Sequence, residues 1–333
     1  MARSTPTAQL VLAAALAGML TSGCGPESAA GPAATVRQAA LEGIAAGTLM
    51  LPNSPTSVKF AVIGDSGRGT KPQRDVADQM VRYHQQFEFP FTIMLGDNLY
   101  EGVATPEDYR VKFEQPYQAL LDRGVLFYAA LGNHDDPRQM YYKQFNMKGR
   151  RYYSFAPPGN TLALVTTPVE FFALDSTYLD REQLTWLDQR LKASAAEWKI
   201  CFLHHPLYTS GRYRLAALVQ RASLEALFVT HNVGVVFSGH EHIYQRSTLQ
   251  SGIQYFVSGG AGSLRTGDGV PTSYIARTYS GDYHFMLVEI EGDDLHFQAI
   301  SRSGRTIDAG TLSRAGRRPA AARVTALGTA GRR

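Results

Sequence analysis

The feature that most constrains this chain is a series of five apolar, β-prone segments that each end in a polar side chain able to bind a metal ion. The segments span residues 58–63, 91–94, 125–131, 199–203 and 233–237, and the side chains that follow them are Asp65, Asp97, Asn133, His204 and the pair His240 and His242. A single ending of this kind is most often a turn. Because open α/β sheets place their sites outside the carboxyl ends of strands, five such endings in succession predict one shared metal site.

The types of these side chains indicate two metal ions. Carboxylate, amide and imidazole ligands suit Fe, Mn or Zn. The carboxylate of Asp97 has two oxygens and can bridge two ions, and Tyr100 offers a phenolate oxygen that suits a trivalent ion. Neither cysteine, Cys24 or Cys201, is placed to contribute. Two ions about 3.5–4 Å apart stabilise the attacking and leaving oxygens in phosphoryl transfer and lower the pKa of bound water.

The alternation of strand and helix patterns predicts one α/β domain over residues 56–302. Helices are expected at residues 74–86, from residue 105 onward, at 182–193 and at 215–228. Further strands are expected at residues 152–155, 161–165, 171–174, 254–257, 285–290 and 295–299.

The segments on either side of this domain have a different composition. Residues 25–55 are rich in Gly, Pro, Ala and Ser and are expected to form a linker, with room for a short helix within 36–51. The formal net charge is +4, but residues 314–333 carry six arginines and no acid, which leaves about −2 elsewhere. We therefore expect residues 303–333 to be a disordered basic tail, and a near-neutral body argues against nucleic acid as a partner.

Residues 1–24 are expected to be an export signal. Arg3 supplies the positive region, and residues 10–20 are apolar but too short for a stable membrane span. The Thr-Ser-Gly-Cys sequence ending at Cys24 resembles a bacterial lipobox, although Thr21 stands where leucine is usual. The protein is therefore expected to be exported and lipid-anchored, in the periplasm or at the outer membrane, with plain secretion as the alternative. A lipid on Cys24 would be its one link to a membrane.

The order of the five motifs resembles that of calcineurin-like metallophosphoesterases, and of small, tartrate-resistant-type purple acid phosphatases in particular. The motifs are Asp65-Ser66-Gly67, Gly96-Asp97-Asn98-Leu99-Tyr100, Gly132-Asn133-His134-Asp135, residues 200–204 and Gly239-His240-Glu241-His242. Tyr100 separates the purple acid phosphatases from the wider superfamily. The resemblance covers residues 58–300 and implies an α/β (α+β) fold, a four-layer αββα sandwich of two mixed β-sheets flanked by helices.

The resemblance also implies a role for each ligand. Fe(III) would be held by Asp65, Asp97, Tyr100 and His242, and a divalent Fe, Zn or Mn ion by Asp97, Asn133, His204 and His240, with Asp97 bridging. The implied reaction is hydrolysis of a small phosphate monoester, in which a metal-activated hydroxide attacks phosphorus in line. His134, just outside the metals, would contact phosphate or give a proton to the leaving group.

One position departs from the family pattern. A histidine is usual near Gly211, but this chain has Arg212, which can bind phosphate as a fixed cation and is a poor proton donor. Two roles are left open for His205: it acts beside the metal ligands, or it simply packs beside Pro206.

Two other functions are weighed against monoester hydrolysis. One is a phosphodiesterase with the same metals, which an open groove without a clamp for the phosphate end would favour. The other is a non-catalytic, metal-bearing surface lipoprotein, against which the complete ligand set argues. The sequence does not fix the natural substrate or the oligomeric state.

Overall fold

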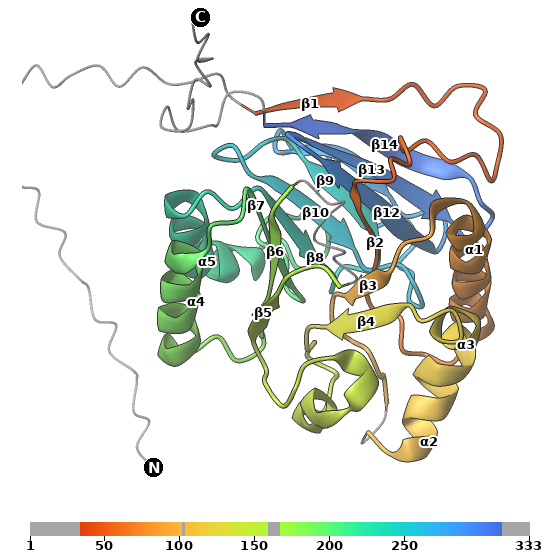
Figure 1. Ribbon diagram of the computed structural model, residues 1–333, viewed down its shortest axis with the longest axis horizontal. Coiled ribbons are helices and arrows are strands. Elements are labelled where there is room, and N and C mark those ends of the chain that lie inside the picture. The colour runs from red at the N-terminus through yellow and green to blue at the C-terminus, as the bar shows by residue number, and fades with distance from the viewer. Residues whose placement is uncertain (1–33, 102–103, 159–166, 315–333) are drawn as a thin grey trace, which may run out of the picture. The chain divides into compact units, whose positions relative to one another are not determined.

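The computed structural model describes residues 34–101, 104–158 and 167–314, all within one compact unit, Pro32–Arg333. In these ranges the strands form two seven-stranded sheets (Figure 1). The first sheet has, in spatial order, β1 (Thr35–Gln38), β14 (Thr306–Ser313), β13 (Asp294–Ser301), β12 (His284–Glu291), β2 (Val58–Ile63), β3 (Phe91–Met94) and β4 (Leu126–Ala129). The second has β11 (Ile275–Tyr279), β9 (Tyr244–Ser247), β10 (Gln254–Ser258), β8 (Val235–Ser238), β7 (Trp198–Leu203), β6 (Val169–Ala173) and β5 (Tyr153–Phe155).

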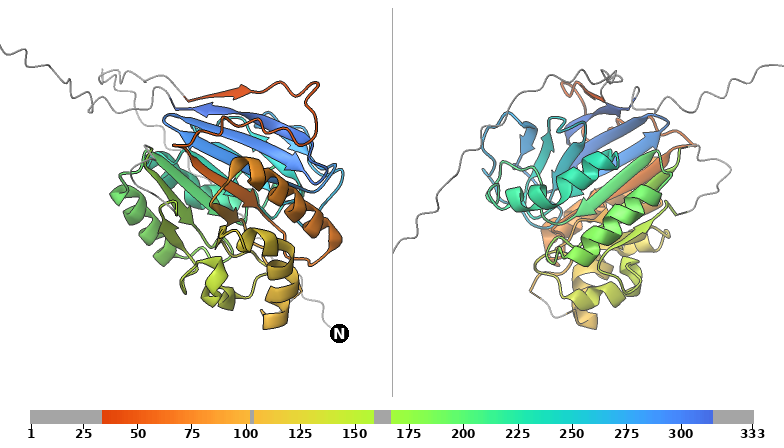
Figure 2. Two further views of the ribbon diagram at one scale, coloured as in Figure 1. Left: turned by 45° about the vertical axis from the view of Figure 1, so that its right-hand side comes forward. Right: turned by 90° about the vertical axis from the view of Figure 1, so that its left-hand side faces the viewer.

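Helices cover the outer side of each sheet (Figures 1 and 2). The first sheet carries α1 (Lys71–Phe87) and α3 (Gln115–Leu121), and α3 continues from α2 (Pro106–Tyr109) through a π-helical turn, Arg110–Glu114. The second sheet carries α4 (Arg181–Ala193) and α5 (Ala217–Thr230). Short 3-10 turns span Pro137–Tyr141 and Lys143–Phe145. No helix in the described ranges is long and apolar enough to cross a membrane.

The core lies between the two sheets and is rich in aromatic side chains. Phe60 of β2 packs edge-on against Phe171 of β6 at 5.1 Å and against Phe237 of β8 at 6.0 Å between ring centroids. All three rings are fully buried, and such contacts add to the free energy gained from removing large apolar surfaces from water. The four-layer sandwich of two mixed sheets that the sequence predicted is therefore the observed fold.

Parallel pairing sets the position of the site. In the first sheet β2, β3 and β4 are parallel neighbours, with Ile93 of β3 opposite Val62 on one side and Tyr128 on the other. In the second sheet β6, β7, β8 and β10 are parallel neighbours. Because parallel strands end at the same edge, each sheet presents a row of loops at its carboxyl edge.

The sequence placed the domain's ends incorrectly. Residues 306–313 form β14, where the sequence predicted a disordered tail, and residues 35–38 form β1 instead of a linker with a short helix. β14 pairs with both β1 and β13, and its Asp308 is fully buried against Arg246. A buried charged residue interrupts the apolar pattern that marks a strand, and the cation that compensates its charge lies far away in the chain.

Other differences are local. The sequence did not predict the short strands β9 and β11. β9 follows the last motif closely and has the polar sequence YQRS, which is typical of a loop, and β11 has exposed, polar positions. The strand expected at residues 161–165, the export signal at 1–24, the first part of the linker and the tail beyond residue 314 lie outside the described residues.

Candidate metal centre

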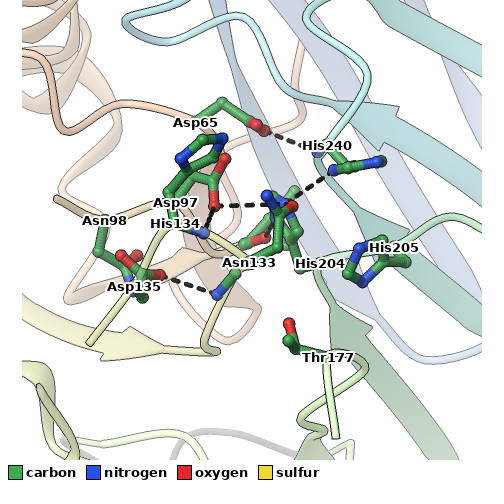
Figure 3. Close-up of polar contacts among 12 residues, drawn as sticks. Asp65, Asp97, Asn98, Asn133, His134, Asp135, Thr177, His204, His205 and His240 are labelled. Carbon is green, nitrogen blue, oxygen red and sulfur yellow. Dashed lines mark hydrogen bonds and ion pairs between the residues drawn. The ribbon is translucent and has the colours of Figure 1, made fainter. Parts of the chain in front are cut away.

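Seven side chains that the sequence named as metal ligands lie in the loops at the carboxyl ends of these parallel strands. Figure 3 shows five of them, Asp65, Asp97, Asn133, His204 and His240. Asp65, Asp97 and Asn133 follow β2, β3 and β4, with Tyr100 in the loop of Asp97, whereas His204 follows β7 and His240 and His242 follow β8. Asp65, Asp97 and His240 have φ angles of 55°, 52° and 66°. Residues other than glycine rarely adopt this left-handed conformation, and such strain collects at functional sites.

His204 forms the middle of one half of the cluster. Its Nδ1 lies 2.9 Å from the carbonyl oxygen of Leu95, which only accepts hydrogen bonds, so Nδ1 carries a proton. In a neutral ring, Nε2 then presents a lone pair. The Nε2 atom lies 3.1 Å from Asn133 Oδ1, 3.1 Å from His240 Nδ1 and 3.4 Å from Asp97 Oδ1.

The carboxylates around His204 favour a positive charge at this point. Burial lowers the pKa of His204, but the carboxylates of Asp97 and Asp65 outweigh that effect and raise the pKa overall. Ligand atoms of Asp65, Asp97 and His204 all lie within 4.8 Å of one another, and so do those of His204, His205 and His240. A metal ion bound by these atoms would replace the proton, so the donor set fits a divalent ion.

Tyr100 forms the middle of the other half. Its hydroxyl lies 3.1 Å from Asp65 Oδ1, to which it donates, and 3.0 Å from His242 Nε2. His242 Nε2 is also 3.3 Å from Asp65 Oδ1. Burial raises the pKa of Tyr100 far above its usual value, and Asp65 and Asp97 raise it further. The hydroxyl therefore keeps its proton unless a strong cation takes its place, which is the condition that a trivalent ion meets.

Asp97 lies between the two halves. It accepts a hydrogen bond from the backbone N–H of His134 at 3.0 Å. Burial raises the pKa of Asp97, but His204 and the His134 N–H lower it by more, so Asp97 is held ionised. Gly132 packs so closely that a Cβ atom there would lie 2.2 Å from Asp97 Oδ1. Glycine is therefore required for the two loops to meet at this point.

His134 and Arg212, the two side chains predicted to act on substrate, differ in position. His134 is exposed beside the cluster, with its ring centroid 4.9 Å from that of Tyr100. Arg212 is exposed and lies over the ring of Tyr213 at 5.9 Å, while its backbone N–H donates to Asp268. The next residue, Tyr213, lies against a proposed ligand, with its ring 4.2 Å from that of His240. The structure therefore brings His134 to the cluster and leaves Arg212 outside it.

His205 lies beside the cluster. Its ring is 4.4 Å from that of His240, and its Nδ1 is 3.0 Å from the hydroxyl of Ser176. Burial, together with the neighbouring His204, lowers the pKa of His205 to about 4. The ring is therefore neutral at physiological pH and contributes no positive charge near the cluster.

Three residues that sequence reasoning did not assign support the cluster. Asp135 accepts hydrogen bonds from Gly132 N at 2.8 Å and Asn98 Nδ2 at 3.0 Å, and burial, then Asp97, raises its pKa to about 7. Glu241 is buried and pairs with Arg265 at 3.1 Å. Arg68 lies over the ring of Tyr100. Asp135 and Glu241 stand inside the motifs and could have been singled out there, but nothing in the sequence marks Arg68.

Comparison with known protein sequences connects this geometry to one family. The profile of the family described as calcineurin-like phosphoesterase matches residues 58–244. Purple acid phosphatase 4 of Arabidopsis thaliana is 31% identical over 239 residues, which is 63% of this chain and 69% of that protein. Purple acid phosphatase 3 of the same plant is 29% identical over 267 residues, 70% of this chain and 72% of that protein.

Comparison with solved structures gives the same fold. A purple acid phosphatase from yellow lupin seeds superposes with a TM-score of 0.63 at 16% identity, over 79% of this chain and 55% of that one. A dimetal phosphatase from Danio rerio has a TM-score of 0.58 at 14% identity, over 78% and 99%. The Plasmodium protein GAP50, described as an anchor in the inner membrane complex, has a TM-score of 0.67 at 19% identity, over 78% and 89%.

Proposed function

This chain belongs to the calcineurin-like phosphoesterase family, and from that membership we propose that it hydrolyses phosphate monoesters at a centre of two metal ions. The observation that carries the proposal is the convergence of acceptor atoms around His204 Nε2 and around the Tyr100 hydroxyl, with Asp97 between them. Two adjoining clusters of this kind suit two ions, as the dinuclear centres of the family's phosphatases imply.

We assign Fe(III) to the half that contains Asp65, Tyr100 and His242, because a phenol with so high a pKa gives up its proton only to a strongly charged cation. Asn133, His204 and His240 would hold a divalent Fe, Zn or Mn ion, and Asp97 would be shared. When bound, the two ions supply Lewis acidity, which acidifies water and neutralises charge that develops on the phosphoryl group.

The residues around the ions would orient the substrate and move a proton. His134 is exposed beside Tyr100 and can donate a proton to the departing alkoxide. Its loop is fixed because Asp135 accepts hydrogen bonds from Gly132 N and Leu99 N, at 2.8 and 3.0 Å. A fixed loop keeps the imidazole in one orientation, and that pre-organisation lowers the cost of reaching the transition state.

The test is the visible spectrum and metal content of the purified protein beside a Tyr100→Phe variant. We expect about two metal ions per chain and a purple phenolate-to-iron absorption band that the variant loses. A colourless protein that holds two Zn or Mn ions would keep the phosphoesterase assignment and remove Tyr100 from the ligand set. A protein that binds metal and hydrolyses no phosphoester would favour the non-catalytic alternative.

A phosphodiesterase is the second candidate, and one observation favours it. Arg212, the cation expected to bind phosphate, has an exposed side chain that lies over the ring of Tyr213, and Asn133 and His134 are exposed as well. A site that is open, and in which no cation binds the free oxygens of a terminal phosphate, has room for a second ester group on the phosphorus atom. Comparing kcat/KM for p-nitrophenyl phosphate and bis-p-nitrophenyl phosphate separates the two, and a higher value for the diester would replace the monoesterase proposal.

We also propose that the protein is exported and lipid-anchored through Cys24, with plain secretion as the alternative. The charged start, the apolar stretch and the lipobox-like sequence support this. Mass spectrometry of the mature N-terminus distinguishes them, because a lipidated first residue at Cys24 would support anchoring and an unmodified terminus elsewhere would support secretion.

A further inference from the structure

Arg68 lies over the aromatic ring of Tyr100. Its guanidinium carbon is 3.6 Å from the ring centroid, closer than the roughly 6 Å at which cation–π attraction becomes significant. The side chain is 31% exposed, so water only partly screens its charge from the ring. Arg68 follows Gly67 of the first motif and is neither a proposed metal ligand nor a proposed substrate contact.

Three loops hold this stack in place. Tyr100 N donates to Gly67 O at 2.8 Å, and Asp65 N donates to Gly96 O at 3.1 Å, so the loops that carry Arg68 and Tyr100 are joined through their backbones. A Cβ atom on Gly67 would lie 1.9 Å from the carbonyl oxygen of Asn98, which shows how closely the two loops approach. The two loops that carry these side chains are therefore fixed relative to one another by their backbones.

The third loop orients the guanidinium. Arg68 Nε donates to the hydroxyl of Ser263 at 3.0 Å, and Ala261 N donates to Gly64 O at 3.1 Å, which fixes the Ser263 loop to the first motif. A hydrogen bond between Ser263 and the Tyr100 side chain also lowers the pKa of Tyr100, against the larger effects of burial and nearby carboxylates. On the outer side Arg68 Nη1 lies 3.3 Å from the exposed Glu101.

We propose that Arg68 is a positioning residue that sets the electronic character of Tyr100 as a metal ligand, an inference that rests on the ferric ion proposed above. A cation over the ring stabilises electron density on the phenolate and makes the oxygen a weaker donor. An ion bound by a weaker donor keeps more of its positive charge. Arg68 therefore makes the ion a stronger Lewis acid and makes Fe(III) easier to reduce.

The direction of each spectroscopic effect follows from where Arg68 lies. Arg68 lies over the ring of Tyr100, whereas an ion held by Tyr100 would be bound through the hydroxyl oxygen. The charge of Arg68 would therefore act more strongly on the phenolate, which donates the electron in the transition, than on the iron, which accepts it. Removing the charge raises the energy of the phenolate electrons and moves the charge-transfer band to longer wavelength. It also lowers the reduction potential of the iron, because a better donor and a missing positive charge both stabilise Fe(III).

The experiment compares Arg68→Gln, which removes the charge, with Arg68→Lys, which keeps a charge but loses the planar stack. Arg82→Gln is the matched control, because Arg82 is an exposed arginine on α1 and the change in net charge is the same. Each protein is reconstituted with iron and measured for iron content, band position and reduction potential. We expect the band of Arg68→Gln to move to longer wavelength and its potential to fall, with Arg68→Lys between it and the wild type and Arg82→Gln unchanged.

The outcomes separate this inference from the function on which it rests. A wild-type protein that binds two ions and shows no charge-transfer band refutes the ferric assignment and, with it, the role of Arg68. A purple wild type whose band and potential are unchanged in Arg68→Gln overturns the role of Arg68 alone. If Arg68→Gln fails to fold or to take up iron, Arg68→Met, which also removes the charge, decides: a band displaced to longer wavelength supports the proposal and an unmoved band overturns it.

Discussion

Asp97 connects the two halves of the candidate centre through a single carboxylate. It lies 3.4 Å from His204 Nε2 and shares a side-chain hydrogen bond with Tyr100. We expect Asp97→Asn to weaken both metal sites by more than roughly 100-fold, since changes even in the partners of metal ligands cost 10–100-fold. Inductively coupled plasma mass spectrometry of the dialysed variant measures the loss.

A matched control for that variant is Asp188→Asn, which neutralises a half-exposed carboxylate on α4 that pairs with His231. It should keep both ions. His240→Ala, by contrast, should reduce the metal content by one ion and spare the half that contains Tyr100. Retention of both ions by Asp97→Asn would contradict the shared role of Asp97.

Asp308 illustrates a buried charge that supports the fold and not the site. It is fully buried, accepts from Tyr244 at 2.7 Å and pairs with Arg246 at 2.8 Å. We expect Asp308→Asn to lower the free energy of unfolding by about 3 kcal/mol, because it leaves the Arg246 charge buried without its counter-ion. Urea unfolding measures this, and a loss below about 1 kcal/mol would place the pair among weak surface pairs.

The sequence predicted which side chains gather at this edge of the sheets because their signal is local; that they bind metal stays a prediction. Each of Asp65, Asp97, Asn133, His204 and His240 stands at or shortly after the end of an apolar strand, and the structure brings all of them together. The Arg68 stack could not be predicted in this way. It depends on the packing of three loops that are distant in the sequence, and none of these loops has a pattern that marks the contact.

At the scale of elements, β14 is the piece of the first sheet that the sequence missed. It joins β13 on one side and β1 on the other, and it supplies the buried Asp308. The parallel strands were predictable because they are nearly all apolar, as strands buried on both faces are. β14 has the sequence TIDAGTLS, in which polar and small residues interrupt the apolar pattern that predicts a strand.

Truncation tests whether β14 belongs to the folded domain. A chain that ends after residue 314 keeps β14 and should unfold at nearly the same temperature as the full chain. A chain that ends after residue 303 loses β14 and leaves the edge of β13 unpaired, so we expect it to be insoluble or to melt far lower. Circular dichroism melts compare the two. Equal melting temperatures would restore the sequence-based boundary at residue 302.

At the scale of the whole molecule, stability should depend on pH through His284. This residue is fully buried in β12, and burial lowers its pKa from 6.5 to about 4. The unfolded chain therefore binds a proton at higher pH than the folded one. Stability is fully present above pH 6.5 and is lost as pH falls toward 4, by roughly 3 kcal/mol.

Denaturant unfolding at several pH values checks the His284 prediction against a His284→Gln variant, which cannot titrate. The difference in pH dependence between the two proteins isolates His284 from the carboxylates that also titrate in this range. Parallel stability curves from pH 4 to 7 would show that His284 has the same pKa in the folded and unfolded states.

Removal of metal should also destabilise the whole domain. An ion present at about 1,000 times its Kd stabilises the folded state by about 4 kcal/mol, which corresponds to roughly 10 °C in Tm for a domain of this size. Calorimetry before and after chelation measures the change, and re-addition of metal should restore the Tm. An unchanged Tm would mean that the cluster binds no ion tightly.

The ligands are divided between the two sheets, with Asp65, Asp97 and Asn133 on one and His204 and His240 on the other. A bound ion would thus connect chain segments that are far apart in the sequence, for example those of Asn133 and His204, which are 71 residues apart. Such a link resembles a reversible cross-link, comparable in its effect on the unfolded chain to a disulfide. The supply of metal would then govern how tightly the two halves of the sandwich are held together, in addition to catalysis.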